Sequence, residues 1–275
     1  MARDRTREAA GGICVAGIEL AAGMARAVVA RAEGGRLRVV GRGETTLAAD
    51  AVVGGLVVEP RVVTAAVASA LGAAERGVPS ERMVIAIDGD DVRTYHVKTP
   101  FDREESGTPI VRAEADRAVR EAREEAARAA QTAVADDPAL RGVATARMTD
   151  EVAALVLDGR ELDSVEGYHG RALEVHTDVA VAPLVLSGAA LATVAVRRRP
   201  TAVPGIYALA RLVAASGIAD AGIVRVGADV TALAIVRERR VVAHACSVSA
   251  ATRSPRARKR ATTTRSYGPR SSLFQ

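Results

Sequence analysis

The sequence of 275 residues has no tryptophan, only 2% aromatic residues and only two cysteines, Cys14 and Cys246. So few aromatic side chains argue against a stacking surface for single-stranded nucleic acid. Two cysteines are too few for a disulfide framework or a zinc site, and they indicate a reducing, cytoplasmic environment. No apolar run reaches the roughly 18 residues that would span a bilayer, so no transmembrane helix is expected.

Motifs of well-known chemistry are also missing. The sequence has neither a Gly-x-x-x-x-Gly-Lys-Ser/Thr phosphate loop nor a Gly-x-Ser-x-Gly elbow, so a P-loop or hydrolase function has no support. The stretch Asp88-Gly89-Asp90-Asp91 lacks the rest of a calcium loop, and we interpret it as a solvated turn. Four scattered histidines without metal-ligand spacing are interpreted as packed or surface residues: His96, His169, His176 and His244.

The net charge of +5 comes from the end of the chain. Residues 251–275 hold seven basic residues and no acidic one, so residues 1–250 carry +5 − 7 = −2. The basic balance therefore does not indicate a specific nucleic-acid partner. Residues 1–11 are charged and lack the apolar segment of a secretory signal, which predicts a disordered arm.

Hydrophobic residues make up 49% of the chain, and their spacing predicts a globular α/β protein. The predicted helices are a segment from Pro60 to Ala74 and the ranges Arg112–Val134, Leu184–Arg198 and Ile206–Ala215. The predicted strands are Ile13–Ile18, Ala25–Ala32, Leu37–Glu44, Met83–Ile87, Glu151–Leu157, Leu173–Val181, Ile223–Val226, Leu233–Val236 and Val241–Ala245.

Two distant segments repeat one pattern. The segment that begins at Ile13 and the segment that begins at Ile223 both read as strand, small-residue loop, strand, turn and strand. Two facing hairpins with tight loops can bring backbone N–H groups to an anion from opposite sides. The pattern fits a phosphate clamp, and it also fits ordinary hairpins.

The order of these elements resembles the FtsA family of actin-like cell-division proteins and, more distantly, the PilM family of pilus-assembly proteins. The resemblance rests on four stretches taken in sequence order: Gly17-Ile18-Glu19-Leu20-Ala21-Ala22, Met83-Val84-Ile85-Ala86-Ile87-Asp88-Gly89 with Val92-Arg93-Thr94-Tyr95, Leu157-Asp158-Gly159-Arg160 with Gly170-Arg171-Ala172-Leu173-Glu174-Val175, and Val226-Gly227-Ala228-Asp229-Val230-Thr231. It implies an actin-like (ribonuclease H-like) α/β fold with an inserted α+β subdomain and an incomplete second half. The implied ranges are 12–98 and 182–220 for the first subdomain, 99–181 for the insertion and 221–249 for the start of the second subdomain.

The resemblance also implies an ATP and Mg²⁺ site between the two repeated segments. The matching positions are Gly17, Glu19, Ala21, Ala22, Gly23, Arg225, Gly227, Asp229 and Thr231, with Glu19 as the candidate metal ligand. Ala22 lacks the hydroxyl expected in the first loop, and Arg225 stands where the family has an acidic residue. A positive charge near a hydrated cation is unfavourable, so we expect weakened Mg-ATP hydrolysis. Arg225 could instead contact a phosphate directly.

The expected function is an FtsA-like adaptor of the bacterial division machinery, with possible self-association. The resemblance implies FtsZ and other divisome proteins as partners, although the part that binds FtsZ is expected to be missing from this sequence. The alternatives are a PilM-like component of type IV pilus assembly and an actin-fold kinase. Location at the inner membrane is expected only for a full-length parent. Residues 250–275 are a basic arm, a lipid-binding tail or the product of a shifted reading frame, since codons for Ser249–Ser254 read one base earlier can encode the family's Gly-Gly-Asp-Ala-Leu-Thr.

Overall fold

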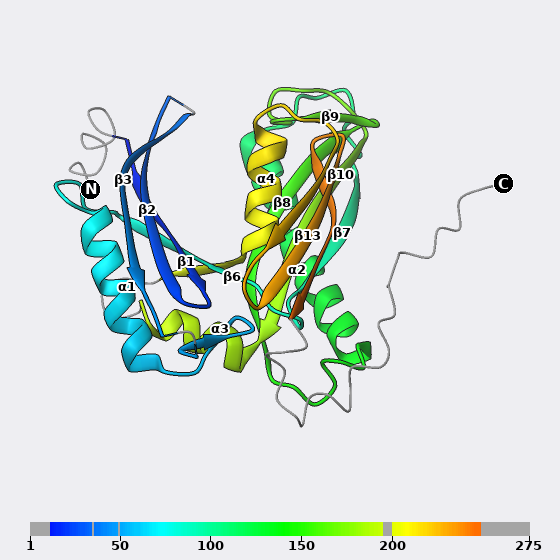
Figure 1. The fold of residues 1–275 in the computed structure, drawn as a ribbon. Coiled ribbons are helices and arrows are strands. Elements are labelled where there is room, and N and C mark those ends of the chain that lie inside the picture. Colours follow the sequence, from blue (N-terminus) through cyan, green and yellow to red (C-terminus); the bar gives the residue numbers. More distant parts are fainter. Residues whose placement is uncertain (1–11, 35, 49, 195–199, 249–275) are drawn as a thin grey trace.

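The computed structural model describes residues 12–248, except residues 35, 49 and 195–199. The predictions for residues 1–11 and for the basic tail therefore lie outside the described residues. Three main sheets and four helices make up the described part, and the chain passes through the sheets in the order first, inserted, first, second (Figure 1).

The first sheet is mixed, with the strand order β11-β6-β1-β2-β3. Strands β1 (Cys14–Ala21), β2 (Met24–Glu33) and β3 (Arg36–Thr46) form an antiparallel ribbon, and β6 (Arg82–Ile87) and β11 (Thr201–Pro204) run parallel to β1. Strand β2 alternates buried and exposed residues: Ala25, Ala27 and Val29 are buried, whereas Arg26 and Val28 are exposed, so one face of the ribbon is covered. Two short strands, β4 (Val52–Val53) and β5 (Leu56–Val57), form a separate hairpin beside this sheet.

Helix α1 (Pro60–Ala74) packs on one face of this sheet. Pro60 is accommodated at the start of the helix, where its missing N–H has no intrahelical partner. Two glycines in β3 let the helix approach, because a Cβ atom at Gly41 or Gly43 would collide with the carbonyl groups of Ala74 or Ala70. The helix therefore lies directly against the backbone of β3.

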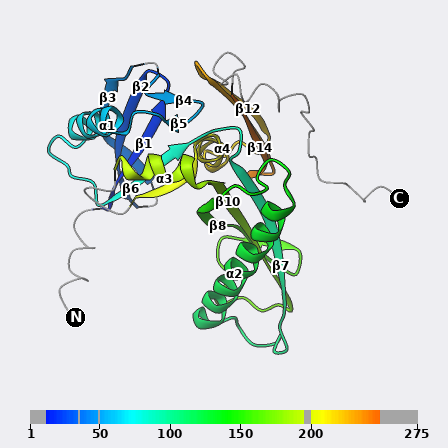
Figure 2. The same ribbon diagram turned by 90° about the horizontal axis from the view of Figure 1, so that it is seen from below.

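The inserted sheet is antiparallel, with the order β7 (Arg93–Asp102), β10 (Ala172–Pro183), β8 (Thr145–Leu157) and β9 (Arg160–Leu162). Helix α2 (Arg112–Asp136) lies along it (Figure 2). Its buried residues recur every four positions and are all alanines: Ala118, Ala122, Ala126 and Ala130. Small side chains on one helical face allow close packing against a sheet, although each contributes little buried apolar area.

The second ribbon consists of β12 (Ala221–Val226), β13 (Val230–Arg237) and β14 (Arg240–Val248), all antiparallel. Helix α4 (Gly205–Ala215) covers one of its faces, and α3 (Leu184–Ala192) packs near β5 and β6. Each ribbon is a three-stranded antiparallel unit, so the repeat predicted from the sequence is confirmed at the level of strands.

The predicted helices and strands are confirmed, and the differences concern their ends. The strand predicted from Glu151 begins at Thr145, and the helix predicted from Leu184 to Arg198 is described only to Ala192. Sequence reasoning predicted neither a strand over Arg93–Asp102, where Pro100 interrupts an otherwise regular alternation of half-buried and exposed residues, nor the short strands β4, β5, β9 and β11. The inserted sheet begins at Arg93; the domain boundaries proposed above stay predictions.

Candidate functional site

One arginine connects the two ribbons. The Arg225 side chain extends from β12, and its Nη1 donates to Glu19 Oε1 of β1 at 2.6 Å. Its Nη2 donates to Asp88 Oδ2 at 2.5 Å, just beyond the end of β6. The three residues, together with Arg26, which donates to Glu19 Oε2 at 3.2 Å, form what we call the Arg225 cluster. The cluster brings together Glu19 and Arg225, two of the residues predicted for the site.

Asp88 is the buried centre of this cluster, with a side chain that is 4% exposed. Its second oxygen, Oδ1, accepts a hydrogen bond from the backbone N–H of Ile206 at 3.1 Å, in the first turn of α4. A carboxylate at a helix N-terminus is favoured, because it satisfies an otherwise unpaired N–H and faces the positive end of the helix dipole. The interpretation of Asp88-Gly89-Asp90-Asp91 as a solvated turn is therefore wrong for Asp88.

Burial also raises the pKa of the thiol next to Asp88. Cys246 Sγ lies 3.6 Å from Asp88 Oδ1. Burial, and then the nearby Asp88 carboxylate, raise the pKa of Cys246 to about 12. Since the thiolate is the reactive form, this cysteine is expected to react slowly with alkylating reagents while the cluster is intact.

Two further hydrogen bonds join the same regions. The Gly54 N–H, in the turn between β4 and β5, donates to Asp229 Oδ2 at 2.5 Å, and the Val248 N–H donates to Asp90 Oδ1 at 2.5 Å. Gly54 has a φ of +59°, a conformation that glycine adopts without strain. Asp229, predicted to contact a nucleotide, is thus hydrogen-bonded to a backbone N–H of the chain itself.

The other predicted positions are spread over the two ribbons. Gly17 lies within β1, and Ala21, Ala22 and Gly23 lie at the two-residue turn between β1 and β2. Gly227 shapes the turn between β12 and β13, where its N–H donates to the carbonyl of Val230. Thr231 pairs with Val226 on the exposed face of the second ribbon, whereas Arg225 pairs with Ala232 on the covered face. Thr231 is therefore not brought to the Arg225 cluster.

The cluster does not fit a magnesium ion. All four carboxylate oxygens of Glu19 and Asp88 already accept a hydrogen bond from the protein: two from Arg225, one from Arg26 and one from the Ile206 N–H. A magnesium ion needs oxygen ligands, directly or through its waters, and is repelled by a guanidinium at hydrogen-bond distance from the same oxygens. Among the residues that the structure describes, no group of three or more His, Cys, Asp or Glu side chains could hold a metal ion.

Sequence reasoning missed Asp88 and Gly54. Asp88 directly follows the apolar strand Met83–Ile87, and a carboxylate at the end of a buried strand is a signal that could have found it. Gly54 carries no such signal, because its role depends on a backbone N–H that only the folded hairpin directs toward Asp229.

A second polar group, the Asp178 cluster, connects the inserted sheet with α4 and β14. Asp178, 5% exposed at its side chain, accepts hydrogen bonds at 2.6 Å from both Tyr207 Oη and His96 Nδ1. His244 Nε2 lies 2.5 Å from Thr94 Oγ1, and its ring lies 6.0 Å from that of Tyr207. Burial lowers the pKa of His244 to about 4, and burial together with Asp178 raises the pKa of Tyr207 well above its usual range.

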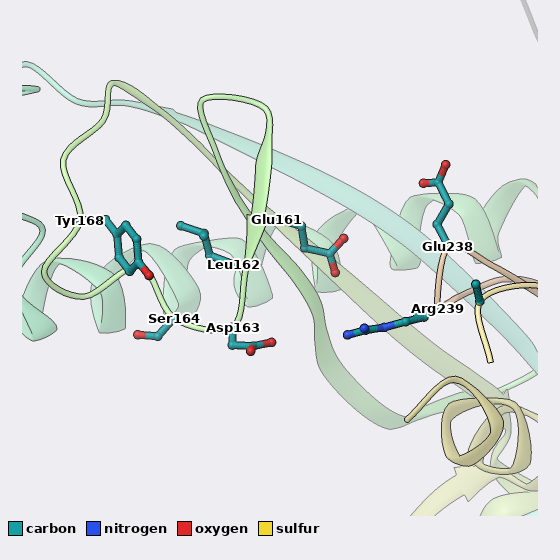
Figure 3. Close-up of a pocket in the computed structure, with 8 residues that line it drawn as sticks. Glu161, Leu162, Asp163, Ser164, Tyr168, Glu238 and Arg239 are labelled. Carbon is teal, nitrogen blue, oxygen red and sulfur yellow. The ribbon is translucent and has the colours of Figure 1, made fainter. Parts of the chain in front are cut away.

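A cleft of 660 Å³ lies between the loop after β9 and the turn between β13 and β14 (Figure 3). Arg239 extends from that turn toward the β9 side of the cleft, and an exposed tyrosine, Tyr168, lies at its other end. Its lining combines acidic, polar and apolar side chains: Glu161, Leu162, Asp163, Ser164, Tyr168, Ala219, Glu238 and Arg239. None of the residues predicted for the nucleotide site lines it.

Comparison with proteins of known structure identifies the fold. No family model matches the sequence, and no curated protein matches it. A chain of the PilM–PilN type IV pilus biogenesis complex superimposes with a TM-score of 0.52 at 17% identity, over 85% of this chain and 61% of that one. The fold is actin-like. The actin-like fold expected from the sequence is thereby confirmed, and the chain spans about three fifths of the length of this neighbour.

Two more distant structures were also found. Ethanolamine utilization protein EutJ from Carboxydothermus hydrogenoformans has a TM-score of 0.38 at 16% identity, over 86% of this chain and 52% of its own. A protein of unknown function with an actin-like ATPase fold from Bacteroides thetaiotaomicron has a TM-score of 0.34 at 8% identity, over 90% and 73%. The match at a TM-score of 0.52 supports the actin-like fold and does not single out FtsA. None of the described helices is long and apolar enough to cross a membrane.

Proposed function

We propose that this chain is a protein-binding scaffold with an actin-like fold, working in the manner of PilM rather than as an ATP-hydrolysing enzyme. The observation that carries the proposal is the pairing of Arg225 with Glu19 and Asp88, which leaves no carboxylate oxygen of this pair without a protein donor. An actin-like protein whose acidic residues are neutralised in this way keeps its shape but lacks the means to position a metal-bound phosphate.

The neighbour at a TM-score of 0.52 belongs to a complex of PilM with PilN. By analogy, the partner of this chain would be a segment of another protein, and a membrane-bound partner would bring the chain to the membrane. The cleft beside Tyr168 is the candidate surface for such a segment. An exposed tyrosine and a leucine beside three carboxylates suit a short segment with apolar and basic side chains.

An FtsA-like adaptor of cell division is the second candidate, favoured by the four sequence stretches that resemble that family. The two candidates differ in their partner. FtsA receives the tail of FtsZ, whereas a PilM-like protein binds a short amino-terminal segment of a membrane protein. Both candidates share the absence of ATP turnover, and a kinase would require it.

The test combines a turnover assay with peptide titration. We expect no Mg²⁺-dependent ATP hydrolysis above background, and we expect an amino-terminal peptide of a PilN-type protein to bind with a Kd on the order of micromolar. Tyr168→Ala should weaken binding about tenfold if the tyrosine anchors the peptide. Leu212→Ala is the matched control, because Leu212 of α4 is also an exposed large apolar residue but does not line the cleft.

Each other outcome counts against part of the proposal. ATP hydrolysis that is abolished by Glu19→Gln would contradict the scaffold function. Binding of an FtsZ carboxy-terminal peptide, and not of the PilN-type peptide, would replace the PilM-like function by the FtsA-like one. Equal effects of Tyr168→Ala and Leu212→Ala would exclude the cleft as the binding surface.

A further inference from the structure

The charges of the Arg225 cluster balance without any ion. Glu19 and Asp88 supply −2, and Arg26 and Arg225 supply +2, so the sum is zero. Adding a divalent cation would leave an excess of +2 in a region where Asp88 is almost fully buried. Because charge–charge interactions strengthen as water is excluded, such an excess is strongly unfavourable. The cluster is therefore electrostatically complete as it stands.

The guanidinium of Arg225 also joins two carboxylates that are far apart in the sequence. Its two terminal nitrogens each contact a different carboxylate, and those carboxylates are 206 and 137 residues away in the sequence. A planar guanidinium with several fixed N–H directions suits this arrangement, whereas a lysine ammonium on a flexible stem does not. Glu19 belongs to the first ribbon, Asp88 follows β6, and Arg225 belongs to the second ribbon.

We propose that Arg225 takes the place of a bound cation between the two ribbons, holding Glu19 and Asp88 against the second ribbon so that the two ribbons stay together without a metal ion or a nucleotide. In this role one side chain replaces an exchangeable ligand. The closed arrangement of the ribbons becomes a fixed property of the folded chain rather than a response to nucleotide. The inference concerns the Arg225 cluster alone and holds whether or not the partner proposed above binds.

Cys246 offers a direct readout of closure. Its sulfur lies beside Asp88, between the covered face of the second ribbon and the end of β6. If the ribbons separate, the thiol gains water and loses its carboxylate neighbour, so its pKa falls toward the ordinary value and its alkylation accelerates. In a Cys14→Ala background Cys246 is the single thiol of the chain.

The first experiment measures iodoacetamide alkylation of Cys246 in the full chain carrying Cys14→Ala. We expect the same slow rate in EDTA, in Mg²⁺ and in Mg-ATP. Arg225→Gln should accelerate alkylation about tenfold or more, because the open state is no longer opposed by two charge-assisted contacts. Loss of the guanidinium acts by itself in the opposite direction, since Arg225 lowers the pKa of the Cys246 thiol, so an acceleration reports opening. Arg26→Gln is the matched control: it removes the other arginine on Glu19, which is exposed and lies in the first ribbon, so the rate should stay close to that of the parent.

The second experiment reverses the charge at this position. Arg225→Asp puts a negative charge on β12 opposite Glu19 and Asp88, which should separate the ribbons in EDTA, and millimolar Mn²⁺ should offset the repulsion and bring them together again. The expected signature is fast alkylation in EDTA that slows toward the parent rate with Mn²⁺. Arg225→Asp combined with Glu19→Gln lacks one ligand and should show little slowing.

Three results would overturn the proposal: a parent rate that Mg²⁺ or Mg-ATP slows, an Arg225→Gln rate equal to that of the parent, and a folded Arg225→Asp variant that Mn²⁺ leaves unchanged. Circular dichroism establishes whether Arg225→Asp is folded. If it is not, Arg225→Gln compared with Arg26→Gln decides the question alone. Peptide binding enters none of these measurements, so failure of the proposed function would be recognised separately.

Discussion

The Arg225 cluster and the Asp178 cluster both contain a buried carboxylate, but the partners of the two carboxylates differ. Each holds a nearly buried carboxylate where the second half of the chain meets an earlier part, and both Asp88 and Asp178 have side chains no more than 5% exposed. Asp88 is paired with an arginine that is always charged. Asp178 is instead bound by a tyrosine hydroxyl and an imidazole, and no arginine contacts it among the described residues.

The two clusters are expected to differ in how they respond to pH. A guanidinium stays protonated at every pH at which proteins fold, so the Arg225 cluster keeps its cation. The Asp178 cluster includes the imidazole of His244, and burial lowers the pKa of that imidazole, so its protonation in acid is opposed by the fold. The connection between the inserted sheet and the second ribbon should therefore respond to acid earlier than the connection between the two ribbons.

The largest expected effect is acid destabilisation through His244. Its folded pKa of about 4 lies below the ordinary value of 6.5, so between these values the unfolded chain binds a proton that the folded chain does not. Stability is complete above about pH 6.5 and falls as pH falls, by about 3 kcal/mol near pH 4. The groups that face the imidazole are the Thr94 hydroxyl, the Tyr207 ring, His96, Asp178 and Arg93.

Urea unfolding measured from about pH 7.5 down to about pH 4.5 checks this expectation. His244→Gln should be less stable than the parent near neutral pH but should lose less stability on acidification. The free energies of unfolding of the parent and the variant should therefore converge as the pH falls. Parallel curves for the parent and the variant would remove His244 as the origin of the acid response.

Much of the fold was predictable because the hydrophobic periodicity is clear. The stripe Val63, Val67 and Leu71 predicted α1, and the apolar run Met83–Ile87 predicted β6. The strand β7 was missed because Pro100 stands within its alternation of Tyr95, Val97 and Phe101 with polar residues; the proline is tolerated because β7 is an edge strand. Strands of two to four residues, such as β4 and β9, are too short for any period to be recognised.

The site was predictable in part. The repeat and the resemblance drew attention to Glu19 and Arg225, and the structure joins them. The sequence could not show that the same guanidinium also reaches Asp88, because that contact depends on how β6 and β12 are placed in three dimensions. His96 and His244 looked scattered for the same reason: 148 residues separate them in the chain (244 − 96), yet both belong to the Asp178 cluster.

A smaller effect is expected from Tyr207→Phe, which weakens the Asp178 cluster without changing any charge. The variant removes the hydroxyl that donates to Asp178 Oδ2 at 2.6 Å, and a buried carboxylate oxygen then lacks this donor. The free energy of unfolding should fall by about 2 kcal/mol. Tyr168→Phe is the matched control, since Tyr168 is 51% exposed and should change stability by no more than about 0.5 kcal/mol. Equal losses in both variants would contradict a special role for the Tyr207 hydroxyl.

The smallest effect concerns another contact between the inserted sheet and the second ribbon. Arg240 Nη2 of β14 lies 2.8 Å from Glu161 Oε2 of β9, but the two side chains are 29% and 45% exposed. An exposed ion pair contributes about 0 to 1 kcal/mol and is screened by salt, so Glu161→Gln should lower stability by less than about 1 kcal/mol, and by almost nothing in about 1 M NaCl. Urea unfolding at low and high salt measures both values. A loss larger than that of Tyr207→Phe, or one that salt does not reduce, would mean that the exposed pair, and not the buried Asp178 cluster, holds the inserted sheet to the second ribbon.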